Sequence, residues 1–288
     1  MPSGWACPRC GWAPGEQDGV AITAPALADT VTGFDPASFS PLELVETGHF
    51  WFEPRNRLIT GLARRFFPDA RSYLEIGCGT GFVLVAMAQR LTLTRIVGSE
   101  LHPQGLNIAR RRAPDGRVEW AQMDARAIPA RAEFDLVGAY DVVEHIEEDE
   151  TVLRQAHDAL RPGGGIIVAV PQHPWLWSAT DDAAHHVRRY RRGELEGKLR
   201  MAGFEILAST SYTSVLLPPM MMARMLGKRR GRGSSSAMVN DDEMQPGPVA
   251  NSLMKLILHL EVSATLHGMR WPVGGSRVVV ARKAQASR

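Results

Sequence analysis

Apolar runs alternate with amphipathic segments along most of this 288-residue chain. Runs rich in Val, Ile, Leu, Tyr and Phe that end at glycine or polar residues are typical of buried strands, whereas a 3.6-residue apolar period is typical of helices. The pattern predicts strands at 72–76, 95–100, 118–121, 134–140, 165–170, 204–209 and 276–281, and helices at 82–90, 103–112, 148–160 and 192–202. This alternation predicts an α/β fold, in which helices cover both faces of a parallel sheet and a ligand binds at the carboxyl ends of the strands.

The connection between the sixth and seventh predicted strands is too long for a plain loop, because it spans about 65 residues. It contains a methionine-rich run that would line an adaptable apolar pocket or fill a core. An apolar helix is predicted at 251–268, with Asn251 or Ser252 as its N-cap. The region 227–250 has little apolar periodicity and is predicted to be a mobile loop. We interpret the insertion as a cap over the substrate.

These features divide the chain into four parts. They are an extension with a CxxC pair (1–40), a helical lid (41–71), a core (72–210 with 276–283) and the helical insertion (211–275).

The first predicted strand leads into a glycine-rich turn, YLEIGCGTGF at 73–82. Without a Cβ, Gly77, Gly79 and Gly81 can adopt positive φ and let a ligand lie against the backbone. A dinucleotide fingerprint would read GxGxxG, whereas this turn reads GxGxG and follows Glu75. A carboxylate there would repel a diphosphate, so an amino group or a sulfonium is the better ligand.

The motif ExGxGxG after a strand resembles motif I of the class I S-adenosylmethionine-dependent methyltransferases. The run FDLV…DVVEHI at 134–146 resembles the matching segment of quinone-biosynthesis and related small-molecule methyltransferases. HFWFxxRN at 49–56 and P…LWS…D…HxRRY at 171–190 resemble a bacterial group within them (type 11/23). The resemblance implies a Rossmann-like, doubly wound sheet of seven strands with the last antiparallel, an N-terminal helical lid, and S-adenosyl-L-methionine as cofactor.

Two acidic residues follow neighbouring strands. Glu100 ends the second strand, where an α/β nucleotide fold presents a carboxylate to the ribose hydroxyls, although a helix N-cap would also suit it. By resemblance, Asp124 accepts a hydrogen bond from the adenine amine, unless it is a simple turn residue. The cofactor residues implied are Glu75, Gly77, Cys78, Gly79, Gly81, Phe82, Glu100, Leu101, Met123, Asp124, Ala125, Tyr140, Asp141 and His145.

His145 is the first candidate for a general base, because an imidazole with an ordinary pKa near 6.5 accepts protons at neutral pH. The alternative is that it only shapes the cofactor pocket. The loop after the fifth strand should face the acceptor, so the catalytic candidates are His145, His173, His185 and Tyr190. The substrate-binding candidates are Trp51, His173, Trp175, His185, Arg188 and Tyr190. A solvated basic face is the alternative for the neighbouring Arg191 and Arg192.

Composition and charge narrow the substrate class and the cellular compartment expected for the protein. The formal charge is only +2, and the chain has no NPPY-like or DPPY-like turn and no Pro-Cys nucleophile, so no nucleic-acid substrate is expected. Three cysteines and no signal peptide predict a cytoplasmic protein. Cys7 and Cys10 supply half of a four-ligand zinc site, so no metal is predicted, and a remnant or flexible tail is favoured unless two chains share an ion. The oligomeric state is not indicated.

The sequence therefore predicts methyl transfer to a small organic acceptor, at oxygen first, carbon next and nitrogen third, in secondary or cell-envelope metabolism. One alternative is a lipid-linked or isoprenoid phosphate acceptor, with peripheral membrane contact through 211–232. The other is a noncatalytic module that only binds the cofactor.

Overall fold

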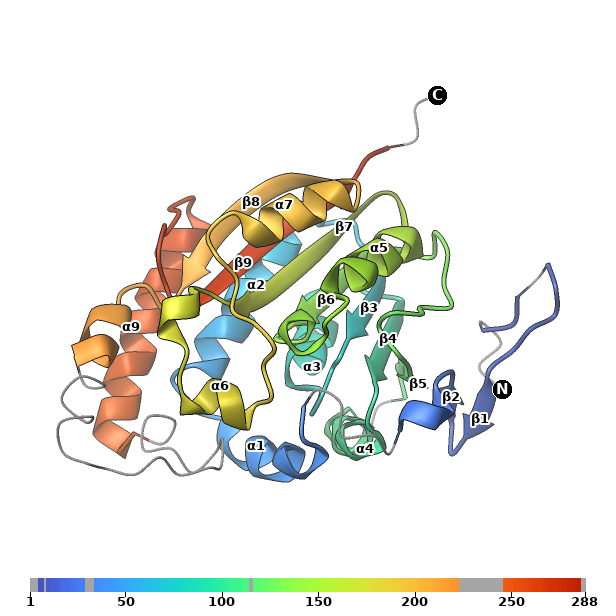
Figure 1. Cartoon of the computed structure of the whole chain (residues 1–288), viewed down its shortest axis with the longest axis horizontal. Helices are drawn as coiled ribbons and strands as arrows, with labels where there is room; N and C mark the ends of the chain where they lie inside the picture. The colour runs from blue at the N-terminus through green and yellow to red at the C-terminus, as the bar shows by residue number, and fades with distance from the viewer. Residues whose placement is uncertain (1–4, 8, 29–33, 114–115, 223–245, 286–288) are drawn as a thin grey trace.

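One sheet organises the part of the chain that the computed structural model describes, which comprises residues 5–7, 9–28, 34–113, 116–222 and 246–285. Within these ranges the sheet has nine strands in the order β1-β2-β5-β4-β3-β6-β7-β9-β8 (Figure 1). The strands are β1 (Gly15–Gln17), β2 (Val20–Ile22), β3 (Ser72–Ile76), β4 (Arg95–Glu100), β5 (Val118–Gln122), β6 (Phe134–Tyr140), β7 (Leu160–Pro171), β8 (Phe204–Tyr212) and β9 (Ser276–Lys283).

The seven predicted strands are all present, and β9 runs antiparallel to both β7 and β8. The Rossmann-like α/β class is therefore confirmed, but the sheet has nine strands where seven were predicted. The two additional strands come from the N-terminal extension, since β1 and β2 form a hairpin and β2 pairs in parallel with β5. Asp18 and Gly19 connect them with φ values of 51° and 77°, as a two-residue hairpin turn requires. Three-residue strands carry too little period-two pattern to be recognised in sequence.

Helices cover both faces of the sheet. One face carries α2 (Phe52–Phe66), α3 (Phe82–Arg90), α4 (Pro103–Arg112) and α9 (Pro248–Leu266), and the other carries α5 (Asp149–Ala159) and α7 (Glu194–Met201). The short helices are α1 (Phe39–Glu46) and α6 (Ala179–Ala183), with 3-10 turns η1 (Pro25–Leu27), η2 (Pro36–Ser38), η3 (Val143–His145) and η4 (Pro174–Leu176).

Side-chain alternation along the strands separates the core into two layers. Tyr73 packs with the α2 side and Leu74 with the α5 side, although both are fully buried. Such two-sided burial explains why the central strands read as continuous apolar runs in the sequence. No helix in the described residues is long and apolar enough to cross a membrane.

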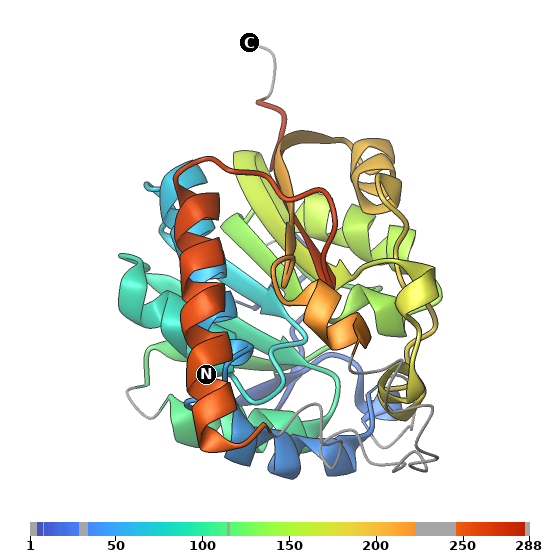
Figure 2. The ribbon, with the colours of Figure 1, turned by 90° about the vertical axis from the view of Figure 1, so that its left-hand side faces the viewer.

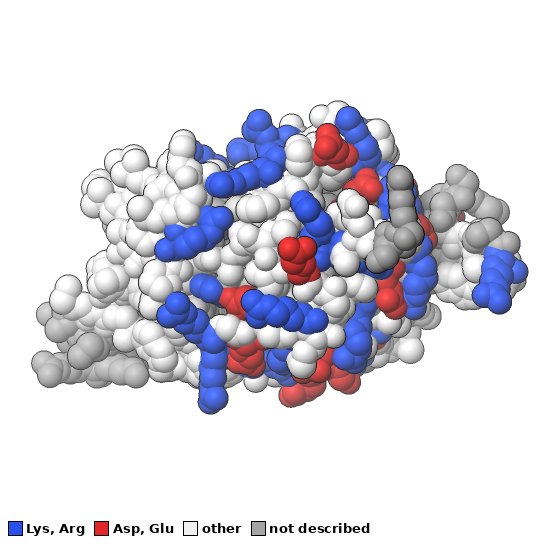
Figure 3. Space-filling model, turned by 90° about the horizontal axis from the view of Figure 1, so that it is seen from above, with Lys and Arg blue, Asp and Glu red and all other residues white. Residues whose placement is uncertain are grey.

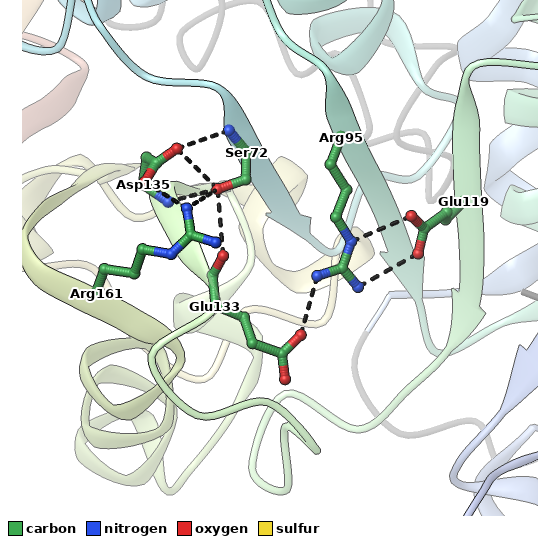
Figure 4. Close-up of polar contacts among 6 residues, drawn as sticks. All are labelled: Ser72, Arg95, Glu119, Glu133, Asp135 and Arg161. Carbon is green, nitrogen blue, oxygen red and sulfur yellow. Dashed lines mark hydrogen bonds and ion pairs between the residues drawn. The ribbon is translucent and has the colours of Figure 1, made fainter. Parts of the chain in front are cut away.

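A polar network fixes the amino ends of the central strands, away from the ligand edge (Figure 4). Asp135 accepts hydrogen bonds from the Ser72 backbone N–H and hydroxyl, each at 2.9 Å, and from Arg161 at 2.9 Å. Beside it, Arg95 of β4 pairs with Glu119 at 3.1 Å and Glu133 at 2.9 Å. These contacts hold neighbouring strands in register, which fixes where their opposite ends lie.

The insertion packs on the lid. Helix α9 runs beside α2, as Figure 2 shows, and Arg57 of α2 donates to the His259 carbonyl at 2.9 Å. The helix begins at Pro248, three residues before the predicted start, because Gly247 is the N-cap and proline suits the first turn. Asn251 therefore does not cap it, and its side chain instead bonds Gly48 and Phe50 before α2. The predicted mobile loop 227–250 lies largely outside the described residues.

Candidate active site

The glycine turn joins β3 to α3 in left-handed backbone. Gly77, Gly79 and Gly81 have φ values of 62°, 52° and 76°, which confirms the positive φ predicted for them. A Cβ at Gly77 would lie 2.6 Å from Val142 Cγ2, and one at Gly81 would lie 2.9 Å from the Cβ of Ala109. Two of the three glycines therefore allow close packing within the protein, and only Gly79 and Gly77 line the cavity described below.

Glu100, at the end of β4, holds this turn in place. Its Oε2 accepts the Gly79 N–H at 3.1 Å, and its Oε1 accepts the backbone N–H groups of Leu101 at 2.7 Å and His102 at 3.1 Å. Burial raises the pKa of this carboxyl, and the three N–H donors oppose that rise. A carboxylate can accept about four hydrogen bonds, so capacity for a further donor remains.

Glu75, two residues before the turn, is a buried carboxyl that interacts electrostatically with Arg55 of the lid helix α2. The Tyr73 hydroxyl donates to Glu75 at 2.6 Å. Burial raises the pKa of Glu75 to about 8, against the opposing effects of Tyr73 and Arg55. Near neutral pH this carboxyl therefore gains or loses a proton easily, and a cation nearby would favour the charged form.

Arg55 crosses from α2 to the end of β6, where it forms an ion pair with Asp141. Its guanidinium lies 4.6 Å from the centre of the Trp51 ring, and its Nε is buried without a hydrogen-bond partner among the described residues. A buried donor without a partner is costly, so a guanidinium in this position is suited to receive a carboxylate.

These groups line one cavity of about 720 Å³ at the carboxyl ends of the strands. The helices α1 and α6 lie along this edge of the sheet (Figure 1). Thirteen of the fourteen predicted cofactor residues line it, and the exception is Gly81; of the predicted substrate residues only Trp51 does. The lining includes Glu75, Gly77, Gly79 and Glu100 at the strand ends, Phe39 of α1, and Phe50, Trp51 and Phe52 of the lid. The turn, the two carboxyls and the lid aromatics thus share one cavity.

Asp124 lies in the lining but already has a partner. Its carboxylate accepts the Arg126 backbone N–H at 2.9 Å and the Arg126 Nε at 3.0 Å. The neighbouring Met123 and Ala125 are buried and present apolar surface to the cavity. This segment is suited to pack on a flat ring, and the role of Asp124 as a hydrogen-bond acceptor remains a proposal.

His145 also lines the cavity, next to His186. Their ring centres lie 4.8 Å apart in an edge-to-face arrangement. Burial, with His186 adding to it, lowers the pKa of His145 to about 3. The imidazole is therefore neutral at physiological pH and a weak base, which argues against its predicted role as the general base.

The structure places Arg188 and Tyr190 outside the cavity. Tyr190 is fully buried, and its hydroxyl donates to Asp149 of α5 at 2.7 Å. Arg188 pairs with the same Asp149 at 2.8 Å and with Glu147 at 3.1 Å. Both side chains attach the loop to α5, because Asp149 offers a buried acceptor that the sequence pattern does not reveal.

The three remaining predicted residues of this loop also lie outside the lining. His173 stacks on Trp175 with ring centres 5.1 Å apart, and the Trp175 side chain is 58% exposed. His185 is exposed and adopts a positive φ of 54°. The chain turns at this residue. As a result His186, and not the predicted His185, lines the cavity.

The residues missed by sequence reasoning are neighbours of those it selected. His186 and Arg189 line the cavity in place of His185 and Arg188, and Arg55 lies within the lid motif that had contributed only Trp51. From the methionine-rich run, Met220 and Met221 line the cavity, as one of the two predictions for this run proposed. The motifs thus located the segments that line the cavity. They did not show which residue of a loop faces it, because side chains in a loop follow no fixed period.

The CxxC pair of the extension lies apart from this cavity. Cys7 accepts the Gly11 N–H at its carbonyl at 2.9 Å, and Trp5 is buried in the core layer that includes Ala21. Backbone N–H groups of Cys10 and then Arg9 lower the pKa of Cys7. Trp5 thus packs with the sheet, whereas Cys10 is exposed. The expectation that the cysteine pair is a remnant or part of a flexible tail, and binds no metal, stays a prediction.

Comparisons with known proteins show similarity to methyltransferases. A family described as "Methyltransferase domain" matches residues 74–164. The chain is 31% identical over 147 residues to trans-aconitate 2-methyltransferase of Azoarcus sp. (strain BH72), covering 51% of this chain and 54% of that protein. It is 26% identical over 140 residues to a ubiquinone biosynthesis O-methyltransferase of Leptothrix cholodnii, covering 43% and 59%. The matches thus span little more than half the length of either relative.

Among solved structures, the fold resembles phosphoethanolamine N-methyltransferase 2 of Haemonchus contortus, solved in complex with phosphomonomethylethanolamine and S-adenosylhomocysteine. The TM-score is 0.56 at 19% identity, covering 87% of this chain and 58% of that one. At this identity the likeness concerns the fold.

Proposed function

We propose that the chain is a class I S-adenosylmethionine-dependent methyltransferase that transfers a methyl group to a small organic acceptor, and the match of residues 74–164 to a methyltransferase domain and the named relatives support this. The observation that supports this proposal is one cavity whose lining includes the glycine turn, Glu100, His145, His186 and two methionines. Cofactor and acceptor can therefore meet without crossing bulk solvent.

The donor set of the cavity fits S-adenosyl-L-methionine, the cofactor of this domain. Glu75 would face its ammonium group, the buried Arg55 Nε its carboxylate, and Glu100 its ribose hydroxyls, while Met123 and Ala125 would pack on the adenine. When bound, the cofactor supplies an electrophilic methyl group on a sulfonium. The residues of the chain hold the partners at reacting distance, which removes the entropy cost of their encounter.

We assign the acceptor to the part of the lining formed by His145, the loop after β7 and the methionine-rich run, and call this part the acceptor end. Leu176, Met220 and Met221 provide apolar surface, and His186 and Arg189 provide the nearby polar groups. Such a mixture suits a compact molecule with an apolar part and a hydroxyl or acidic end. We place oxygen first as the methylated atom, carbon next and nitrogen third, in secondary or cell-envelope metabolism, and the O-methyltransferase named among the relatives supports that order.

The lid would exclude water during transfer. Phe50, Trp51 and Phe52 contribute aromatic walls to the cavity, and Tyr212 donates to the Trp51 carbonyl at 2.8 Å. Exclusion of water strengthens the attraction between the sulfonium and the carboxyl groups around it.

The direct test is transfer of a labelled methyl group from S-adenosyl-L-methionine into metabolite extracts and hydroxylated organic acids. We expect label in a small organic product, and its loss with Gly79→Asp would exclude a contaminating enzyme. Cofactor binding without label in any fraction would favour the noncatalytic alternative, and label in RNA or DNA would refute the small-molecule acceptor.

One observation favours a second candidate, a lipid-linked acceptor at a membrane surface. Val249, Leu253, Leu256 and Leu260 form a stripe along α9 and are 84%, 58%, 57% and 63% exposed. Their spacing of four, three and four residues places them on one face of the helix. Seen from above, the end of the molecule formed by the insertion carries few charged side chains (Figure 3). An exposed apolar stripe of this kind is typical of contact with a membrane or another apolar surface.

Vesicle co-sedimentation tests this candidate. Leu256→Gln with Leu260→Gln should reduce binding to vesicles of anionic phospholipid at least fivefold, because it removes half of the stripe. The matched control is Leu44→Gln with Met201→Gln, two leucine-sized side chains that are 84% and 70% exposed on other helices. Equal sedimentation of the two double variants would reject membrane contact through α9.

A further inference from the structure

Three potential metal ligands meet at the acceptor end of the cavity. Glu144 and His145 belong to η3, after β6, and His186 follows α6. One ligand atom from each lies within 4.8 Å of the other two, and Glu144 Oε1 is 4.0 Å from His186 Nε2. The two segments are held together, because the Val187 N–H donates to the Glu144 carbonyl at 2.9 Å.

Glu144 is unusual because its carboxyl group is fully buried without a partner. The side chain has no exposed surface, and neither carboxyl oxygen has a hydrogen-bond partner in the described part of the chain. His145 Nδ1 is likewise buried and unpartnered. Buried polar groups normally have a partner, and an unpaired carboxylate is among the most costly to bury. Two such groups side by side indicate a ligand that satisfies both.

His186, the third potential ligand, is oriented to bind the same ion. His186 Nδ1 lies 2.8 Å from Asp181 Oδ1, so the carboxylate holds a proton on Nδ1 and leaves Nε2 facing Glu144 as an acceptor. Arg189 donates to the same Asp181 oxygen at 2.6 Å and keeps it charged. This carboxylate–histidine arrangement is the one that commonly orients metal-binding imidazoles.

The surrounding charges are balanced without neutralising Glu144. Asp141 lies near enough to disfavour a second negative charge, while Arg55 and Arg189 oppose that effect from two sides. A bound cation would satisfy the Glu144 carboxylate, because both of its oxygens and the neighbouring His145 Nδ1 are buried without hydrogen-bond partners among the described residues.

We propose that Glu144, His145 and His186 bind one divalent transition-metal ion, such as Zn²⁺, beside the methyl-transfer site. Two imidazoles and one carboxylate are a ligand set that zinc and its neighbours accept, with a further position open to water or an oxygen ligand. His145 and His186 line the cavity, so that open position faces the acceptor. The proposal departs from the expectation of no metal, and it does not depend on whether the chain transfers methyl groups.

The ligands need to approach one another only slightly. Bonds of about 2.0 to 2.1 Å place tetrahedral ligand atoms roughly 3.3 Å apart. The Glu144 Oε1 to His186 Nε2 distance of 4.0 Å must therefore shorten by less than 1 Å, and no pair of the three ligand atoms by more than about 1.5 Å, which side-chain rotation can supply.

The test is cobalt titration of the full chain after chelator treatment, followed by visible absorption and elemental analysis. We expect one Co²⁺ per chain with the visible absorption of a four- or five-coordinate site, and displacement by added Zn²⁺. Glu144→Gln and His186→Gln should each weaken cobalt binding at least tenfold. Circular dichroism shows whether each variant is folded. If one variant misfolds, the cobalt affinity of the other still tests the proposal.

Two controls separate this site from others. His185→Asn removes an exposed imidazole from the same loop, at a positive φ that asparagine tolerates, and should bind cobalt like the unchanged chain. Cys7→Ser with Cys10→Ser tests the cysteine pair. Cobalt binding that survives Glu144→Gln and His186→Gln, or is lost with the cysteines instead, overturns the proposal, as does a chain that binds no cobalt. Methyl transfer is not the readout, so its failure would not affect this result.

Discussion

At the scale of single residues, the cavity depends on a few buried groups whose neighbours set their properties. Arg55 has one guanidinium nitrogen paired with Asp141 and another without a partner, and Glu75 nearby is a carboxyl with a pKa near 8. Both are poised for a zwitterionic ligand, because an ammonium would favour the charged form of Glu75 and a carboxylate would satisfy Arg55. Neither property can be read from residue type alone.

Gly79→Asp should abolish cofactor binding, with a loss of affinity of at least a hundredfold. The new carboxylate would lie beside Glu100, which accepts the Gly79 N–H at 3.1 Å, and would extend into the cavity. Aspartate tolerates a φ of 52°, so the fold should survive. Isothermal titration calorimetry measures the affinity, and Gly197→Asp, where a Cβ meets nothing within 4 Å, is the control. Undiminished binding would contradict the placement of the cofactor on this turn.

Glu75 should make cofactor binding depend on pH. Its pKa is raised from 4.5 to about 8, so affinity for a ligand with an ammonium group should rise by up to tenfold per unit between pH 6 and 8. The stability of the protein without cofactor should change with pH in the opposite direction, because the folded state binds the Glu75 proton more tightly than the unfolded state does. The contribution of Glu75 to the free energy of unfolding is complete below about pH 4.5 and is lost as pH rises through about 8. Glu75→Gln should flatten both profiles, and parallel profiles for the two proteins would exclude Glu75.

At the scale of elements, the loop from β7 to α7 is fastened to the domain by buried polar contacts. Tyr190 forms a parallel bridge with Gln172, and its backbone N–H donates to the Pro171 carbonyl at 2.9 Å. Its hydroxyl reaches Asp149, which Lys198 of α7 also contacts at 2.6 Å. The conspicuous HxRRY motif therefore supplies both a structural anchor and, through His186 and Arg189, part of the cavity wall.

Tyr190→Phe should lower the free energy of unfolding by about 1 kcal/mol, because one buried hydrogen bond to Asp149 is lost while Lys198 and Arg188 still satisfy that carboxylate. Cofactor affinity should stay within twofold. Denaturant unfolding and calorimetry measure the two quantities. Unchanged stability together with a large fall in turnover would return Tyr190 to the catalytic residues.

At the scale of the whole molecule, the insertion joins the lid to the sheet. Asn251 accepts the Phe50 N–H at 2.8 Å and donates to the Gly48 carbonyl at 2.9 Å, while Lys255 pairs with Glu53 at 3.1 Å. Helix α9 thus holds the segment that brings Trp51 and Arg55 to the cavity. Residues some 200 positions apart in the sequence cooperate in closing one site.

Asn251→Ala should loosen the lid without unfolding the domain. Two hydrogen bonds to the backbone before α2 are removed, so amide exchange across 47–57 should accelerate and cofactor affinity should fall three- to tenfold. Hydrogen exchange with mass spectrometry measures the first effect and calorimetry the second. Ser252→Ala, which removes only a bond to the Pro248 carbonyl within the same helix, is the control, and equal exchange in both variants would separate α9 from lid closure.

The sequence by itself determined the core fold and the cofactor end of the site. Strands at 72–76, 95–100 and 134–140 were predicted to the residue, because strands buried on both faces are continuous apolar runs, and positive φ at the glycine turn follows from the lack of a Cβ. Since parallel strands end at one edge, residues that follow those strands had to meet.

Tertiary structure decided the acceptor end and the outer edge of the sheet. A loop has no period, so only the reversal at His185 shows that His186 faces the cavity, and only the position of Asp149 shows that Tyr190 is an anchor. The three-residue strand β2 exists because β5 offers it an edge. Burial, which no pattern of residue types measures, brings Glu144 beside His145 and His186 and lowers the basicity of His145.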